Sequence, residues 1–250
     1  MILPDFTHAE WALAGVASIF CGVGKAGLAG LGMLNVLIMA HLVPGQASSG
    51  VVLPMLIAAD VLAVTVFGGK HADWRAIGRL IVPMLIGIVA GWGLMPFIPG
   101  GAFGSVIGWM VLAMVSLQLV RQVWPHFDQH LPHSRLFGWI VGIISGLATM
   151  IANAAGPISV IYFLILGFAK REFIATMAWL FLIINVLKVP LSAQQGLING
   201  SSLLLNVVLA PFVGAGFFLG RVMTNKLPQR PFERVVLLLT IISAVRLIVG

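Results

Sequence analysis

Charged residues are scarce in this chain, whose 250 residues include only 14 Lys and Arg and 7 Asp and Glu. They make up 8% of the sequence, whereas a soluble globular domain carries roughly 25%. Hydrophobic residues make up 60%, and the mean hydropathy is +1.09. So few charges cannot cover the surface of a water-soluble protein of this length. We therefore predict an all-α polytopic membrane protein with a single transmembrane domain over residues 1–250.

Cysteines and nucleotide-binding motifs are also missing. Cys21 is the only cysteine, so the chain can form neither an intramolecular disulfide nor a Cys-x-x-Cys redox or metal site. No Gly-x-x-x-x-Gly-Lys-Ser/Thr motif occurs, which excludes direct use of ATP within this chain, and no cofactor is expected. The first eight residues contain no Lys or Arg, so we expect no cleavable signal peptide.

What the chain does contain is a series of long apolar blocks. A membrane-spanning helix needs about 20 apolar residues. The eight blocks are residues 11–40, 47–67, 77–98, 103–123, 136–168, 172–192, 203–224 and 232–249. Their continuous apolar character predicts helices, because the strands of a spanning β-barrel alternate in polarity.

Two of the blocks, 11–40 and 136–168, are too long for one simple span. Their middles are rich in small residues, over Cys21–Gly27 and Met150–Pro157. We expect each block to form two half-helices that meet at membrane depth, where irregular backbone is tolerated only if protein buries it or if it lines a cavity.

The distribution of Lys and Arg predicts the topology. If both long blocks are re-entrant hairpins, every basic connection lies on one side of the membrane and every connection without Lys or Arg on the other. The basic connections are 68–79, 121–135, 169–171 and 221–234, and those without Lys or Arg are 41–46, 96–102 and 193–202. Basic loops stay in the cytoplasm. The net charge of +7 then indicates cytoplasmic loops and no nucleic-acid partner, and both termini are predicted to lie outside, on the side opposite the basic loops.

Each half then contains one hairpin and three crossings, so the second half is inverted relative to the first. The predicted repeats are 10–123 and 136–250, with a linker at 124–135. At an offset of 129, Gly87, Gly91, Pro99, Phe103 and Val106 match Gly216, Gly220, Pro228, Phe232 and Val235. Asp60-Val-Leu-Ala-Val likewise resembles Asn185-Val-Leu-Lys-Val. Inverted repeats with interrupted helices are typical of secondary transporters, whose binding site lies at the repeat interface.

Three ionisable residues lie deep within the blocks: Lys25, Asp60 and Lys188. A charge at the centre of a bilayer costs roughly 2.5–3.5 kcal/mol, so such residues usually face a cavity or a partner. Lys25 lies at the expected tip of the first hairpin, beside Gly24 and Gly27. Together with half-helix N-termini it predicts a positive site for a small anion. The alternative is a lysine that extends to the lipid headgroups.

The second tip carries Asn153 and Gly156 in place of a cation. The Asn153 amide can donate a hydrogen bond to an oxyanion, whereas the alternative interpretation is helix packing through small residues. Lys188 and Asp60 occupy near-equivalent places in the two repeats. Either they form a structural pair, or Lys188 binds substrate while Asp60 carries a coupling proton.

Two hydroxyl residues, Ser49 and Thr176, are expected near the beginnings of the helices that follow the hairpins. They can act as helix caps or line the site. The glycine pairs Gly87-x-x-x-Gly91 and Gly216-x-x-x-Gly220 are interpreted as points of close helix packing.

The histidines of the central connection, His126, His130 and His133, raise the alternative of a divalent-metal permease. Pro125 and Pro132 disrupt the helical face that such ligand spacing would need, so a solvated linker is the favoured interpretation and no metal site is predicted. A membrane-embedded enzyme would need paired acids, a Ser/His dyad or metal ligands at one depth. Asp60 is the only acid deep in a block, so no catalytic residue is predicted.

The order of features along nearly the whole chain resembles the TauE/SafE sulfite-exporter family of bacterial membrane proteins. The features are a glycine-rich first helix (Gly22 to Gly32), Pro44-x-x-Ala47-Ser48-Ser49, the loop Lys70-His-Ala-Asp73-Trp74-Arg75, and a Gly-rich span that ends at a proline in each half. The resemblance implies movement of sulfite, sulfonates or related organosulfur anions across the bacterial inner membrane, and in that membrane the predicted topology places both termini in the periplasm.

The predicted function is therefore secondary export of a small sulfur oxyanion by alternating access of two inverted repeats. Proton coupling through Asp60 and passive equilibration both remain open. The predicted partners are the anion and the lipid bilayer, and the sequence allows a homodimer.

Overall fold

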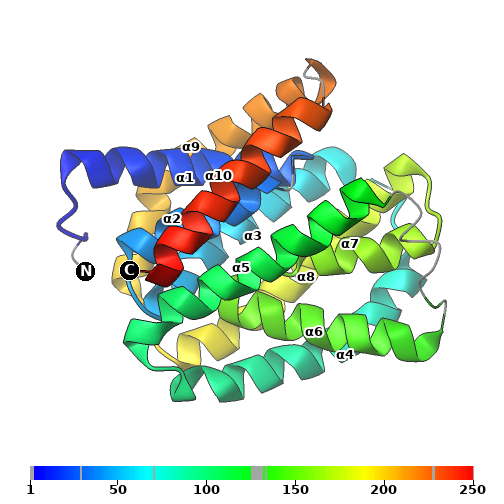
Figure 1. Cartoon of the computed structure of the whole chain (residues 1–250), viewed down its shortest axis with the longest axis horizontal. Helices are drawn as coiled ribbons and strands as arrows, with labels where there is room; N and C mark the ends of the chain where they lie inside the picture. Colours follow the sequence, from blue (N-terminus) through cyan, green and yellow to red (C-terminus); the bar gives the residue numbers. More distant parts are fainter. Residues whose placement is uncertain are drawn as a thin grey trace.

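The computed structural model of the chain describes residues 3–28, 30–69, 71–124, 132, 134–226 and 229–249, apart from the side chains of 164–165, 170, 224–226 and 229–234. The described residues form helices and no strand (Figure 1). The helices are α1 (His8–Lys25), α2 (Gly30–Leu42), α3 (Ala47–Phe67), α4 (Trp74–Leu94), α5 (Gly100–Val123), α6 (Arg135–Ala152), α7 (Gly156–Ile165), α8 (Lys170–Gln194), α9 (Gly200–Lys226) and α10 (Gln229–Val249), with a 3₁₀ turn at Met95–Phe97.

Six of these helices, α3, α4, α5, α6, α8 and α9, are long and apolar enough to cross a membrane. This confirms the prediction of a helical, multi-pass membrane protein. Five of the six correspond to predicted crossings. The sixth, α6, is the first part of the block at 136–168, so this half-helix is by itself as long as a span.

Both long blocks are interrupted, as the sequence predicts. α1 and α2 are separated by residues 26–29, and α6 and α7 by residues 153–155. At the first interruption Gly27 has φ +125°, in the left-handed region where a side chain would be strained. At the second, Asn153 has φ +51° and closes α6, with its N–H and that of Ala154 donating to the carbonyls of Thr149 and Ala148. A left-handed residue that satisfies the last carbonyls is a common helix terminator.

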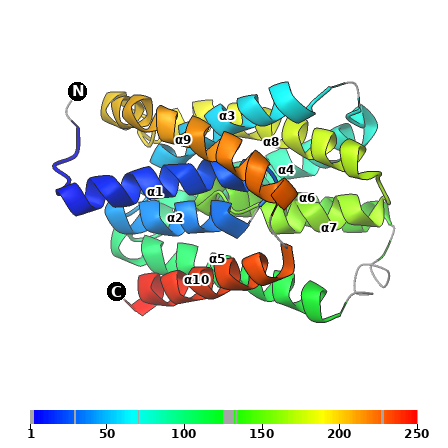
Figure 2. The same cartoon turned by 90° about the horizontal axis from the view of Figure 1, so that it is seen from above.

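Both termini lie at the same end of the helix bundle (Figure 2). α1 begins at this terminal end and α6 begins at the opposite end, where α4 and α8 also begin. The helix ends at that opposite end carry several arginines, namely Arg75, Arg79, Arg121, Arg135, Arg171 and Arg221. Arg246, in the last turn of α10, is an exception near the terminal end.

Two helix pairs approach each other through glycine. In α4, a Cβ on Gly87 would collide with the Ile143 carbonyl oxygen of α6. In α9, a Cβ on Gly216 would collide with the Ile19 carbonyl oxygen of α1. The packing role that the sequence suggests for these glycines is confirmed.

The opposite faces of the same two contacts are also formed by glycine. Gly22 of α1 lies against the Val213 carbonyl of α9, and Gly146 of α6 lies against the Met84 carbonyl of α4. Backbone therefore meets backbone from both sides in each pair, and neither pair has room for a methyl group. Close approach through small residues is how helices gain dispersion energy within a bilayer.

Replacing Gly87 or Gly216 with alanine should lower the free energy of unfolding by about 1–3 kcal/mol, because the added methyl group overpacks a backbone contact. Gly93→Ala and Gly214→Ala are matched controls, since a Cβ at either position meets nothing within 4 Å. These controls should leave stability unchanged or raise it by up to about 1 kcal/mol. Equilibrium unfolding in mixed detergent measures the free energy of unfolding of the two contact variants and the two control variants. Equal effects at contact and control positions would contradict the packing role.

The helix that positions the site is α3, which packs against α1, α2, α6, α8 and α9. It is buried around its whole circumference near its start, where Ser48 to Leu53 are consecutively buried. Two buried polar side chains of α3, Ser49 and Asp60, find partners on other helices.

Candidate functional site

An ion pair joins the tip of the first hairpin to the centre of α3. The Lys25 Nζ lies 2.6 Å from Asp60 Oδ1 and 4.4 Å from the centroid of the Phe181 ring on α8. On its other side, Asp60 Oδ2 accepts a hydrogen bond from Asn185 Nδ2 of α8 at 2.6 Å. Asp60 and Asn185 are buried, whereas the Lys25 side chain is 19% exposed. The carboxylate is thus held from both sides, and Lys25 is the more exposed group of the pair.

A second group surrounds Lys188, one turn after Asn185 on α8. Its Nζ donates to Thr149 O at 2.6 Å, to Thr149 Oγ1 at 3.1 Å and to Asn153 Oδ1 at 2.7 Å. These three acceptors match the three protons of an ammonium group. All three are formally neutral oxygens, so the positive charge of Lys188 has no acidic partner in these contacts.

Asn153 connects Lys188 to the first half of the chain. Its Nδ2 donates to Ser49 O and Ser49 Oγ, each at 3.1 Å, and Ser49 Oγ donates to Met150 O at 3.3 Å. The start of α3 is thereby tied to the end of α6. The predicted site residues Asn153, Ser49 and Lys188 therefore belong to one continuous polar cluster.

The carboxyl end of the first helix in each hairpin, α1 or α6, has a lysine ammonium group nearby. Lys25 lies in the last turn of α1, and Lys188 donates to Thr149 O in the last turn of α6. The last carbonyls of a helix carry partial negative charge, and a cation there is stabilising. The amino-terminal ends of α2 and α7, which begin just after the same two breaks, carry no acidic residue in their first turns.

Taken together, the charges of the two groups around Lys25 and Lys188 do not cancel. Lys25 and Asp60 neutralise each other, while Lys188 adds one positive charge. The cluster of Lys25, Asp60 and Lys188 thus has a net charge of +1 when all three are ionised. In a low-dielectric interior this excess favours the entry of one small anion.

Three glycines expected at the site lie at or near the two tips. Gly24 lets α1 approach α2, because a Cβ there would lie 2.8 Å from the nitrogen of Gly32. Gly27 supplies the left-handed turn at the first tip, and Gly156 begins α7. None of the three has a side chain, so a ligand would meet them through their backbone N–H groups.

Thr176 lies apart from the cluster. Its Oγ1 accepts a hydrogen bond from the Asp73 N–H at 2.9 Å, which ties α8 to the residue that caps α4. It lies twelve residues before Lys188, or about 18 Å along the helix axis. The expectation that Thr176 begins its helix is wrong, because α8 starts at Lys170.

The pairing of ions also differs from the sequence-based alternative. A structural pair between Lys188 and Asp60 was one of the two interpretations, but Asp60 pairs with Lys25. Two further members of the cluster, Asn185 and Thr149, were not singled out. The signal for Asn185 was present, since it matches Asp60 when the two halves are compared. Nothing in the sequence around Thr149 distinguishes it from a packing residue.

No group of three or more His, Cys, Asp and Glu side chains that could hold a metal ion occurs among the described residues. The histidines of the central connection, His126, His130 and His133, lie outside the described residues.

Comparison with known proteins gives one match. A family model described as "Sulfite exporter TauE/SafE" matches residues 11–247, nearly the whole chain. No curated protein matches the chain, and no solved structure does.

Proposed function

The chain belongs to the TauE/SafE sulfite exporter family, and on that premise we propose that it exports a small sulfur oxyanion, such as sulfite or a short sulfonate, as a secondary transporter of the bacterial inner membrane. The observation that carries the proposal is the pair of polar groups at the hairpin tips, in which Lys25, Asp60 and Lys188 would carry one excess positive charge when all three are ionised. Lys25 contacts the anion, and Lys188 supplies the uncompensated charge while it orders the end of α6.

The proposal includes two inverted repeats, and the glycine contacts support it. Gly87 and Gly216 are 129 residues apart, and the carbonyls that they meet, Ile143 and Ile19, are 124 residues apart. Each contact joins a long helix of one half to the first hairpin helix of the other half. One rotation that exchanges the halves would convert the first contact into the second.

The polar cluster supports the same symmetry. Asp60 and Asn185, which match in sequence, hydrogen-bond to each other. Two equivalent residues can touch only where the symmetry axis passes between them. Since α1 and α6 begin at opposite ends of the bundle (Figure 1), this axis lies in the membrane plane, which is the arrangement of inverted-repeat transporters.

Alternating access follows from this arrangement. Each hairpin packs closely on a helix of the other half, so a hairpin and its partner helix can move as one unit. The site at the repeat interface would then open to one side at a time. We place the arginine-rich end in the cytoplasm. The membrane potential, negative inside, then favours the exit of a monovalent anion by about 2.3 kcal/mol per 100 mV.

Proton coupling would act through the ion pair. While Asp60 is ionised it competes with the substrate for Lys25. A proton on Asp60 neutralises the carboxylate and frees the ammonium group for the anion. Anion and proton would then occupy the site together and cross in the same direction, so this coupled step moves no net charge, and the membrane potential would favour export only where the anion crosses without a proton.

Efflux of labelled sulfite from proteoliposomes tests the function. Wild-type protein should release sulfite faster than protein-free liposomes, and an inside-acid pH gradient should accelerate release. Lys25→Met/Asp60→Asn, which removes both charges of the ion pair, should lower the rate at least about tenfold, because a hydrogen bond to a charged group contributes about 1.5–3 kcal/mol. Arg75→Gln, an exposed charge change away from the cluster, is the matched control.

Three results would count against the proposal. Unchanged efflux in the double variant would show that Lys25 does not bind the transported anion. A pH response that persists in Asp60→Asn would exclude Asp60 as the proton carrier. Sulfite release at the protein-free rate by the wild-type protein, with another anion or a divalent metal released instead, would contradict the substrate class.

A further inference from the structure

A cavity of about 560 Å³ lies at the arginine-rich end of the bundle, away from the polar cluster. Its walls come from α4, α6 and α7. Arg79 lines it from α4, Arg135 and Trp139 from α6, and Tyr162 from α7. Tyr162 packs against Gly138, where a Cβ would lie 3.0 Å from the ring, so α6 and α7 meet closely at this wall. The volume is within the range of small-molecule sites.

The charge of this cavity is positive. Arg79 and Arg135 come from two different helices, both are exposed, and no acidic residue is among the described residues that line the cavity. No ion pair is recorded for either arginine within the described part of the chain. Two guanidinium groups at one opening present planar forks of donors that suit a phosphate group.

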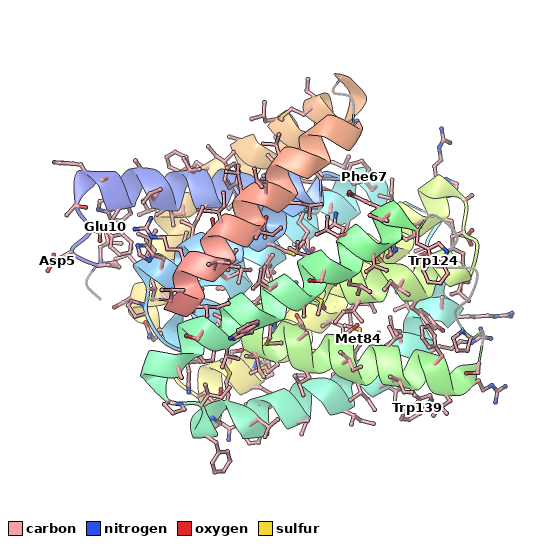
Figure 3. The ribbon with its side chains drawn as sticks, in the orientation of Figure 1. Asp5, Glu10, Phe67, Met84, Trp124 and Trp139 are labelled. Atoms are coloured by element: carbon pink, nitrogen blue, oxygen red, sulfur yellow. The ribbon has the colours of Figure 1, made fainter. Side chains whose placement is uncertain are left out.

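Exposed apolar residues continue from the cavity along α4. Val82, which lines the cavity, is followed on the same face of α4 by Ile86 and Val89, with exposed fractions of 51%, 46% and 53%. On α6, Leu136, Ile140 and Ile144 are also exposed, but none of the three lines the cavity. Trp139, labelled in Figure 3, projects from the outer side of α6 near the cavity. α4 and α6 begin at the same end, so both apolar faces lead from the arginines toward the membrane interior.

From this juxtaposition we infer that the cavity is a binding site for an anionic phospholipid. The phosphate-bearing headgroup lies between Arg79 and Arg135, and the acyl chains lie along the exposed face of α4. Free inorganic phosphate offers the same headgroup chemistry, but it would make no contact with the apolar face of α4 beside the arginines. Basic pockets between helices on the cytoplasmic side of membrane proteins take anionic lipid headgroups. The site is separate from the proposed transport site.

Native mass spectrometry of the detergent-solubilised protein, titrated with phosphatidylglycerol and with phosphatidylcholine, tests the inference. Wild-type protein should bind phosphatidylglycerol at least about tenfold more tightly than phosphatidylcholine. Arg79→Gln/Arg135→Gln should lose this preference, since each basic residue near an anionic headgroup contributes about 1 kcal/mol. Arg75→Gln/Arg171→Gln removes the same number of charges at the same end and should keep it, because neither residue lines the cavity.

A second arm adds inorganic phosphate at millimolar concentration. Retention of bound phosphatidylglycerol supports a lipid site, and its displacement would overturn the lipid assignment in favour of a free anion. Equal phosphatidylglycerol binding by the Arg79/Arg135 variant and the wild type would overturn the site itself. Thermal unfolding of each variant establishes that the proteins compared are folded. Because Arg79 and Arg135 lie outside the transport cluster, either failure leaves the efflux result unaffected.

Discussion

Asp60→Asn is expected to lower the free energy of unfolding by about 3–5 kcal/mol, although the substitution is nearly isosteric. The asparagine can still accept the hydrogen bond from Asn185 Nδ2, so the loss is confined to the ion pair. Lys25 would then keep its charge beside a neutral group in a mostly buried position. Breaking a buried pair by removing one partner leaves a desolvated charge without compensation, and that is the source of the cost. Equilibrium unfolding in mixed detergent micelles gives the measurement.

The double variant Lys25→Met/Asp60→Asn separates this cause from general disruption. Removal of both charges should restore stability to within about 1 kcal/mol of the wild type, because an apolar replacement of a buried ion pair is often neutral. Thr240→Val is a control for the loss of a buried polar group elsewhere, since Thr240 Oγ1 donates to Val236 O within α10. It should cost less than about 1 kcal/mol. If the single and double variants are equally unstable, the ion pair is not what the substitution breaks.

Lys188→Met is expected to have the second large effect. Methionine has a similar length and no branching, so the apolar part of the side chain is preserved, but Thr149 O and Asn153 Oδ1 lose their donor. A hydrogen bond from a charged group contributes about 1.5–3 kcal/mol. Three such bonds are lost, and the partial negative charge of the last carbonyls of α6 loses its nearby cation. We therefore expect the free energy of unfolding to fall by at least about 3 kcal/mol. The same unfolding assay measures it.

Coupling between Lys188 and Asn153 provides the specific test. If both residues hold the tip as one unit, Lys188→Met/Asn153→Ala should cost less than the sum of the two single changes, by about 0.5–3 kcal/mol. Leu187→Ala, at an exposed neighbouring position on α8, is the control: combined with Asn153→Ala, its small effect on the free energy of unfolding should be additive. Additive costs for Lys188 and Asn153 would mean that their hydrogen bond in the structure contributes nothing to stability.

The sequence predicts much of this fold because its signals are local. Long apolar runs identify membrane helices whatever their neighbours are, and small residues mark the two interruptions, where Gly27 and Asn153 adopt left-handed backbone. Helix boundaries were less accurate. α8 begins at Lys170, two residues before its predicted block, which places Thr176 within the helix and away from its cap.

The site was predicted only in part, for a geometric reason. The position of a residue between the ends of an apolar block can be counted in the sequence. Lys25, Asp60 and Lys188 could therefore be predicted to be intramembrane charges. The direction in which each side chain points could not be predicted, because a helix that is apolar on all sides shows no preferred face. α3 is such a helix, and its sequence does not indicate whether Asp60 turns toward α1 or α8.

By itself the sequence determined that this protein lies in a membrane, that two of its long apolar blocks are interrupted, and that few charges are buried. Each of these properties follows from composition or from the backbone preferences of neighbouring residues. Only the tertiary structure decided that Asp60 pairs with Lys25, that Asn185 bonds to Asp60, and that Lys188 holds the end of α6. Those contacts join residues 35 or more positions apart on different helices, and the rotation and packing of whole helices determine which of their side chains meet.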